Sequence, residues 1–138
     1  MKHPLSLLLL TLLSLSLTLR ADDDGPLEGQ MKILVRGTRQ LTQQVSNPAM
    51  QQSTIALLET LKKAAADSKA FEPGMTRDIP EAKRAAFLAD YRTDLDELKD
   101  SFDQIEHAVK AGDYSKAQSL LASVNSIKKE GHAKFKKD

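Results

Sequence analysis

The chain has 138 residues, about the length of one domain, with 4% aromatic residues and no tryptophan. Its 20 basic and 19 acidic side chains give a formal net charge of +1, so no strong basic field favours a nucleic acid or a membrane surface as partner. Because there is no cysteine, disulfides, thiolate catalysis, iron–sulfur ligation, a lipoprotein anchor and covalent cofactor attachment through C-x-x-C-H are all excluded.

The first 21 residues are typical of a secretory signal peptide. Lys2 precedes a leucine-rich run from Leu5 to Leu19, which at about 15 residues is short for a membrane span of ~20. This length favours a cleaved signal over an uncleaved anchor, with cleavage expected after Ala21. Residues 22–138 are then the mature domain, with 18 basic and 19 acidic side chains and no stable membrane association.

The mature chain begins with two expected amphipathic helices. Apolar residues from Leu27 to Val45, with Thr38 completing the spacing, recur at alternating steps of four and three, which predicts one helical face. Asn47 can cap a second helix that starts at Pro48 and runs to about Lys69. Residues 71–78 contain proline and glycine and predict the longest loop.

Two further helices complete the predicted fold. The third starts near Pro80, and Gly112 ends it. Asp113 is a plausible cap for the fourth, which extends nearly to the end of the chain. Four amphipathic helices with mostly short connections predict an all-α, antiparallel up-down-up-down four-helix bundle. The cleanest apolar spacing belongs to the third helix, at Leu88, Tyr91, Leu95, Leu98, Phe102, Ile105 and Val109.

The candidate site comes from a break in the apolar spacing of the last helix. Lys128 and Gly131 occupy positions where apolar residues are expected, His132 follows, and Phe135 restores the spacing. In an antiparallel bundle, the start of the first helix and the end of the fourth lie at the same end and are neighbours. Met31 and His132 should therefore lie at similar depth, where a thioether and an imidazole can hold one iron between them, as in haem proteins that carry electrons.

Less specific explanations compete with this hypothesis. A methionine on a helical apolar face usually belongs to the core, and a histidine near a chain end is usually exposed. No two histidines fall at i and i+4, and the Glu-x-x-His repeat of di-iron bundles is absent, which disfavours zinc or di-iron sites. His107 is expected to face solvent, and no catalytic constellation or phosphate-binding loop is visible.

Several short segments carry a resemblance to a known family. They are Pro26–Leu27–Glu28–Gly29–Gln30–Met31, Asp90–Tyr91–Arg92 with Leu95–Asp96 and Leu98, Gly112 with Lys116–Ala117–Gln118, and His132-x-Lys134–Phe135. In this order and register the chain resembles the cytochrome b562 family of soluble periplasmic haem proteins, which are up-down-up-down bundles. The resemblance covers essentially the whole mature chain.

The resemblance implies a function and a set of site residues. It implies one non-covalent b-type haem, with Met31 and His132 as axial iron ligands and with Leu34, Tyr91 and Leu95 packing against the ring. It also implies a periplasmic electron carrier rather than an enzyme, expected to be a monomer that serves a redox partner protein. Leu95 departs from the family pattern, where an aromatic residue stands.

Two alternatives stay open at this stage. Lys128 and Gly131 also differ from the arginine and the aromatic residue expected there. The first alternative, for which Leu95 and Gly131 leave room, is a family member that has lost haem and serves as a structural or interaction bundle. The second is a helical enzyme or metal sensor, which the lack of clustered ligands disfavours.

Overall fold

The computed structural model describes residues 25–136, and the predicted signal peptide at 1–21 lies outside these residues. The described chain is helical, as the spacing of its apolar residues predicts. Its elements in chain order are α1 (Pro26–Gln44), the short 3-10 helix η1 (Pro48–Met50), α2 (Gln51–Ser68), the 3-10 helix η2 (Gly74–Asp78), α3 (Glu81–Lys110) and α4 (Tyr114–Phe135).

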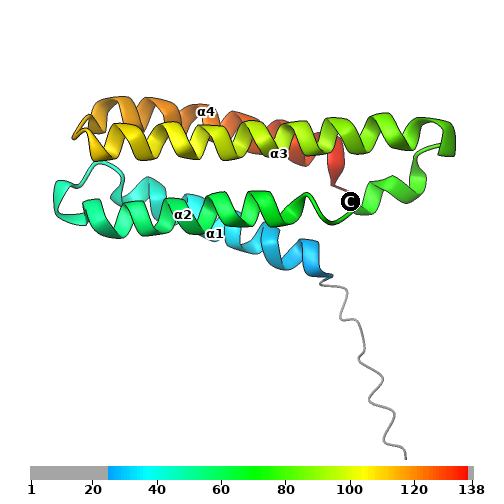
Figure 1. Ribbon diagram of the computed structural model, residues 1–138, viewed down its shortest axis with the longest axis horizontal. Helices are drawn as coiled ribbons and strands as arrows, with labels where there is room; N and C mark the ends of the chain where they lie inside the picture. Colours follow the sequence, from blue (N-terminus) through cyan, green and yellow to red (C-terminus); the bar gives the residue numbers. More distant parts are fainter. Residues whose placement is uncertain (1–24, 137–138) are drawn as a thin grey trace, which may run out of the picture.

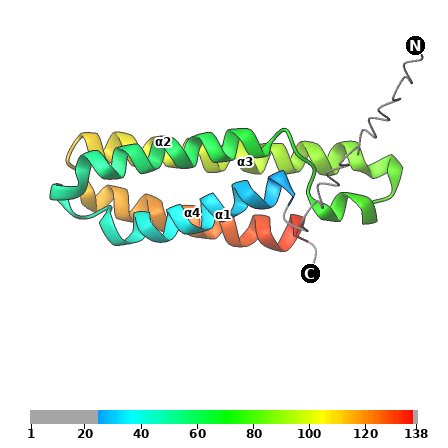
Figure 2. The same cartoon turned by 90° about the horizontal axis from the view of Figure 1, so that it is seen from below.

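The four long helices form an antiparallel up-down-up-down bundle, which confirms the predicted fold class. α1 and α2 lie on one side of the bundle and α3 and α4 on the other (Figure 1). In the perpendicular view α1 lies with α4, and α2 lies with α3 (Figure 2). The start of α1 and the end of α4 therefore share one end of the bundle, which places Met31 and His132 at that end.

The turns between helices follow local rules of capping. The Asn47 side chain accepts a hydrogen bond from the Ala49 backbone N–H, so it caps the 3-10 turn that leads into α2. The Asp113 carboxylate accepts one from the Lys116 N–H at the start of α4. Gly112 has a φ of 72°, a left-handed conformation that glycine adopts readily, and it ends α3 as predicted.

The second predicted helix and the long loop need small corrections. The expected start of the second helix at Pro48 belongs to the separate 3-10 turn, and the α-helix begins at Gln51. The predicted loop at 71–78 contains a 3-10 helix, whose Thr76 is buried. Proline and glycine prevent a continuous α-helix here, but they permit short turns of tighter winding.

The core runs along the axis of the bundle and takes apolar side chains from all four long helices. Gly37 on α1 lets α2 approach closely, since a Cβ built at this position would lie 2.5 Å from Leu61 Cδ2. Each long helix packs closely along the next one in the chain, whereas in the described residues α1 approaches α4 at few points. The seam between α1 and α4 is therefore the most open of the four.

A charged cluster joins α2 to α3 beside the core. Lys62 lies within ion-pair distance of Glu59 at 2.8 Å, Asp103 at 3.1 Å and the buried Glu106. Lys110 pairs with the other oxygen of Glu106 at 2.8 Å. Burial lowers the pKa of Lys62, but the three carboxylates outweigh it and raise that pKa above its ordinary range.

Across residues 25–136, none of the helices combines the length and apolar character that a membrane crossing requires.

Candidate functional site

An apolar cluster occupies the end of the bundle where α1 begins and α4 finishes. Its buried members are Tyr91 and Leu95 of α3 and Phe135 of α4. The Phe135 ring contacts Tyr91 edge to face, with ring centroids 5.4 Å apart, and contacts Phe87 at 5.3 Å. Partly buried side chains pack around the cluster from α1 and α3, namely Leu27, Met31 and Phe87. We call these six residues the end chamber.

Tyr91 anchors the end chamber to α2. Its hydroxyl donates a hydrogen bond of 3.0 Å to the Ser68 carbonyl oxygen, and both residues are buried. Burial raises the pKa of Tyr91 to about 12, with the nearby Arg92 acting weakly in the opposite direction. The side chain is therefore a neutral phenol at physiological pH, with its polar atom satisfied and its ring left to form an apolar wall.

Met31 connects the end chamber to the main core. Its partly buried side chain packs against both clusters, and Leu34, one turn further along α1, is buried in the main core. The structure thus brings together Met31, Tyr91 and Leu95, three of the predicted site residues. Leu34 lies next to this group rather than within the end chamber.

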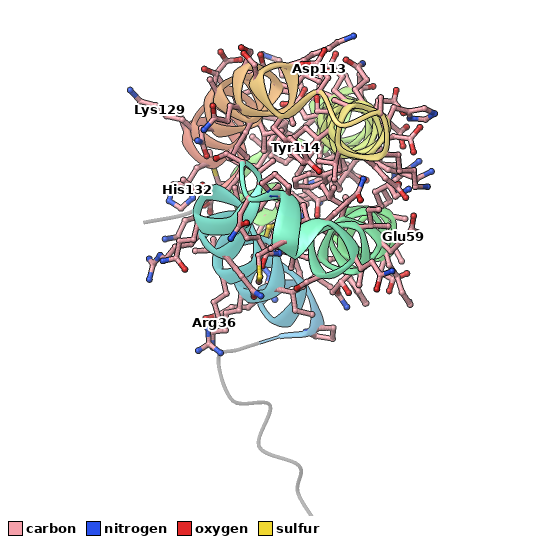
Figure 3. All side chains as sticks on the ribbon, turned by 90° about the vertical axis from the view of Figure 1, so that its left-hand side faces the viewer. Arg36, Glu59, Asp113, Tyr114, Lys129 and His132 are labelled. Atoms are coloured by element: carbon pink, nitrogen blue, oxygen red, sulfur yellow. The ribbon has the colours of Figure 1, made fainter. Side chains whose placement is uncertain are left out.

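His132 lies in the last full turn of α4 and its side chain is exposed. It faces the outside of the bundle on the same side as Lys129 and Arg36, with Glu59 across the molecule (Figure 3). The helix continues through Gly131 to Phe135, which excludes a frayed end as the reason for this glycine. A Cβ built on Gly131 meets no atom within 4 Å, so there is open space beside the imidazole.

Lys128 lies one turn before His132 and is half-buried in the seam between α1 and α4. Burial and the nearby Arg39 guanidinium both lower the pKa of Lys128. Within the described part of the chain, no carboxylate lies within 4.0 Å of either cation. This seam therefore holds two like charges without a neutralising partner.

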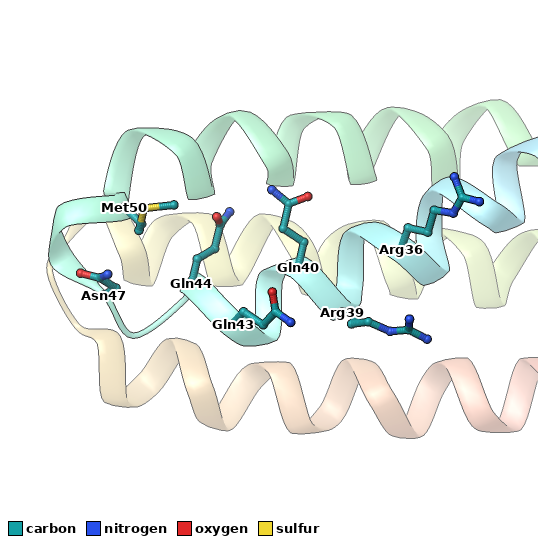
Figure 4. A pocket seen from close by; sticks show the side chains of 7 residues that line it. All are labelled: Arg36, Arg39, Gln40, Gln43, Gln44, Asn47 and Met50. Atoms are coloured by element: carbon teal, nitrogen blue, oxygen red, sulfur yellow. The ribbon is translucent and has the colours of Figure 1, made fainter.

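A shallow surface hollow lies further along α1, toward the turn into α2 (Figure 4). It is open and polar, and it does not include Met31 or the end chamber. We therefore do not regard it as the cofactor site. Its lining residues are Arg36, Arg39, Gln40, Gln43, Gln44, Asn47 and Met50.

Phe87 is the member of the end chamber that sequence reasoning missed. It lies four residues before Tyr91, and residues at this spacing share one helical face. The apolar spacing instead selected Leu88, which is half-buried. The i, i+4 relation to Tyr91 was the available signal.

This end of the bundle combines apolar side chains with two residues that can bind a metal, Met31 and His132. Among residues 25–136, no group of three histidine, cysteine or acidic side chains is placed to hold a metal ion. The end chamber offers a thioether at its edge, from Met31, and the His132 imidazole lies outside it on the last turn of α4. The residue types at this end are those that a flat, mostly apolar cofactor with a ligated metal requires, although Phe135, Tyr91 and Phe87 pack against one another there.

Comparison with known proteins identifies the family. The family model for cytochrome b562 matches residues 26–136, and the chain therefore belongs to the cytochrome b562 family. This membership assigns it to the haem-binding electron-transfer cytochromes, with b-type haem as the cofactor of the family. No curated protein matches the chain.

Proposed function

We propose that this chain is a periplasmic electron carrier that binds one b-type haem non-covalently, with Met31 and His132 as axial ligands. The observation that carries the proposal is the position of Met31 at the edge of an apolar, partly aromatic chamber, at the end of the bundle where α4 presents His132. The signal-like residues 1–21 support export.

The residues present suit a haem. Leu27, Phe87, Tyr91 and Leu95 would provide apolar walls for the ring, and Leu34 would support Met31 from the core side. The open seam between α1 and α4 and the free space at Gly131 favour entry beside His132. With no cysteine in the chain, attachment through thioether bonds is not available.

The two ligands suggest the role of the haem. When bound, the haem supplies an iron that changes its charge by one electron, and methionine ligation favours the ferrous state. If the Met31 thioether and the His132 imidazole both held the iron, no site would be left for a substrate or for oxygen. We therefore infer an electron carrier rather than an enzyme, acting as a monomer with a redox partner protein.

Haemin titration of the purified mature chain tests this proposal. We expect one equivalent to bind, with a sharp Soret band and, on reduction, separate alpha and beta bands. Met31→Ala and His132→Ala should each convert the iron to high spin and weaken binding by about tenfold or more. Met50→Ala and His107→Ala are matched controls that should leave the spectrum unchanged. Normal spectra for both ligand variants would refute the ligand assignment.

One observation favours the alternative of a haem-free structural or interaction bundle. The end chamber is filled by contacts among its own side chains, above all Phe135 against Phe87 and Tyr91, while His132 points outward. A mature chain that remains colourless with excess haemin would establish this alternative and reject the cytochrome.

A further inference from the structure

The ion pairs of this protein lie mostly on the side of α2 and α3. There Lys63 pairs with Asp67, Lys69 with Asp96 at 2.7 Å, and Lys62 and Lys110 with Glu106. Other cations of α3 have no carboxylate within 4.0 Å among residues 25–136, namely Lys83, Arg84, Arg92 and Lys99. On α1 and α4, Lys32 and Lys134 also contact carboxylates. Five cations there have no carboxylate within 4.0 Å among residues 25–136, and they are Arg36, Arg39, Lys116, Lys128 and Lys129. Lys116 lies in the first turn of α4. We call the other four, Arg36, Arg39, Lys128 and Lys129, the α1–α4 cationic face.

The charges of whole helices are also unevenly distributed. α1 and α4 together carry seven basic and two acidic side chains, whereas α3 carries eight acidic and five basic ones. A molecule of nearly zero net charge therefore has one basic side and one acidic side. The basic side is also the side that exposes His132 (Figure 3).

Two places on this side hold cations without a carboxylate. The first is the half-buried Lys128, which the nearby Arg39 guanidinium repels. The second is the hollow of Figure 4, lined by two guanidinium groups, four amide side chains and Met50, with no carboxylate.

These observations point to a ligand that brings carboxylates. Guanidinium groups bind carboxylates with directional paired hydrogen bonds, and arginine is enriched in protein–protein interfaces. The exposed apolar side chains of Ile33 and Val35 on the same helix, 41% and 48% exposed, would add contact area to such an interface. A row of acidic side chains on a protein surface fits both features.

We propose that the α1–α4 cationic face is the docking surface for an acidic redox partner protein, whose carboxylates bind at Arg36 and Arg39. That the partner is a redox protein rests on the proposed function, because Lys128 and Lys129 lie within about one turn of the proposed haem ligand His132. Docking there would bring the partner to the side of the bundle that exposes His132. Complementary charge then accelerates encounter at low ionic strength.

The first test uses the haem-loaded protein and small redox reagents of known charge. Reduced protein should be oxidised by ferricyanide, an anion, faster as ionic strength falls. Arg39→Glu with Lys129→Glu should slow this reaction about tenfold at low salt and reverse its salt dependence. Lys83→Glu with Lys99→Glu makes the same change of net charge on α3, and it should change the rate of oxidation by less than about threefold. Equal effects of the two double variants would overturn the proposal.

The second test needs no haem and so separates this proposal from the proposed function. Binding of a fluorescent poly-glutamate peptide to the mature chain is followed by anisotropy at low salt. We expect saturable binding that Arg39→Glu with Lys129→Glu abolishes and Lys83→Glu with Lys99→Glu retains. Absent binding would overturn the docking surface. Stronger binding to phosphatidylglycerol vesicles than to the peptide would assign the face to a membrane and overturn the acidic protein.

Discussion

Glu106 shows how one buried carboxylate depends on its partners. Its side chain is 4% exposed, and burial alone would disfavour its charge. Hydrogen bonds from Lys110 and Lys62 outweigh that burial and lower the pKa of Glu106 to about 2, from an ordinary value of 4.5. The stabilisation from this group is therefore complete above about pH 5, and it is lost as the pH falls from 4.5 toward 2.

Replacing this carboxylate with an amide tests the argument. Glu106→Gln should lower the free energy of unfolding by about 3 kcal/mol at pH 7, because Lys62 and Lys110 lose their buried partner. The deficit should shrink as the pH falls below about 4, when the native carboxyl also takes up a proton. Urea unfolding at several pH values measures both effects.

Glu59→Gln is the matched control for this experiment. It removes another carboxylate from the same Lys62, but the Glu59 side chain is 59% exposed. Solvent screens such a pair, so the cost should stay below about 1 kcal/mol at any pH. If both variants lost the same stability, burial would not be what gives Glu106 its importance.

At the scale of the helix, the spacing of apolar residues accounts for most of what could be predicted. Thr38, Leu41 and Val45 lie on the expected face of α1 and are buried, as are Phe102 and Ile105 of α3. Spacing along one helix identifies its inner face, and short connections then leave few arrangements of four helices. The caps at Asn47 and Asp113 also follow from local sequence.

What could not be predicted depends on the rotation and separation of neighbouring helices. The apolar spacing includes Leu88 but not Phe87, because a small rotation near the start of α3 decides which one enters the end chamber. The outward position of His132 and the separation of α1 from α4 likewise depend on packing between helices distant in sequence. The hollow at Gln44 arises where α1 meets the turn into α2, and no local motif marks it.

Close packing of α1 on α2 leads to a prediction about two glycines in the same helix. Gly37→Ala should destabilise the fold by about 1–2 kcal/mol, because its Cβ would meet the fully buried Leu61, and this cost outweighs the gain in helix propensity. A Cβ built at Gly29 meets no atom within 4 Å. Gly29→Ala should therefore raise the free energy of unfolding by about 0.5 kcal/mol. Denaturant unfolding of the two variants compares them. Stabilisation by both would mean that α1 and α2 are not closely packed at Gly37.

For the whole molecule, the open seam between α1 and α4 is the consequential feature. Three neighbouring pairs of helices pack closely, namely α1 with α2, α2 with α3, and α3 with α4. The fourth pair, α1 and α4, is more widely separated and lies beside the candidate site. A bundle closed on three sides can admit a flat cofactor through the remaining seam without separating its main core. The α1–α4 cationic face lies on the same side, so cofactor entry and partner docking would use one side of the protein.

This arrangement predicts that haem acts as a strong stabiliser of the whole fold. A ligand that binds the native but not the unfolded chain raises the free energy of unfolding by about 4 kcal/mol when its free concentration is 1,000 times its Kd. For a domain of this size that raises Tm on the order of 15 °C. Circular dichroism melts with and without haemin measure the shift.

Because the His132 side chain is exposed, His132→Ala should leave the haem-free Tm unchanged and remove most of the haem-dependent rise in Tm. His107→Ala should retain that rise, and an equal loss in both variants would show that the cofactor is held elsewhere.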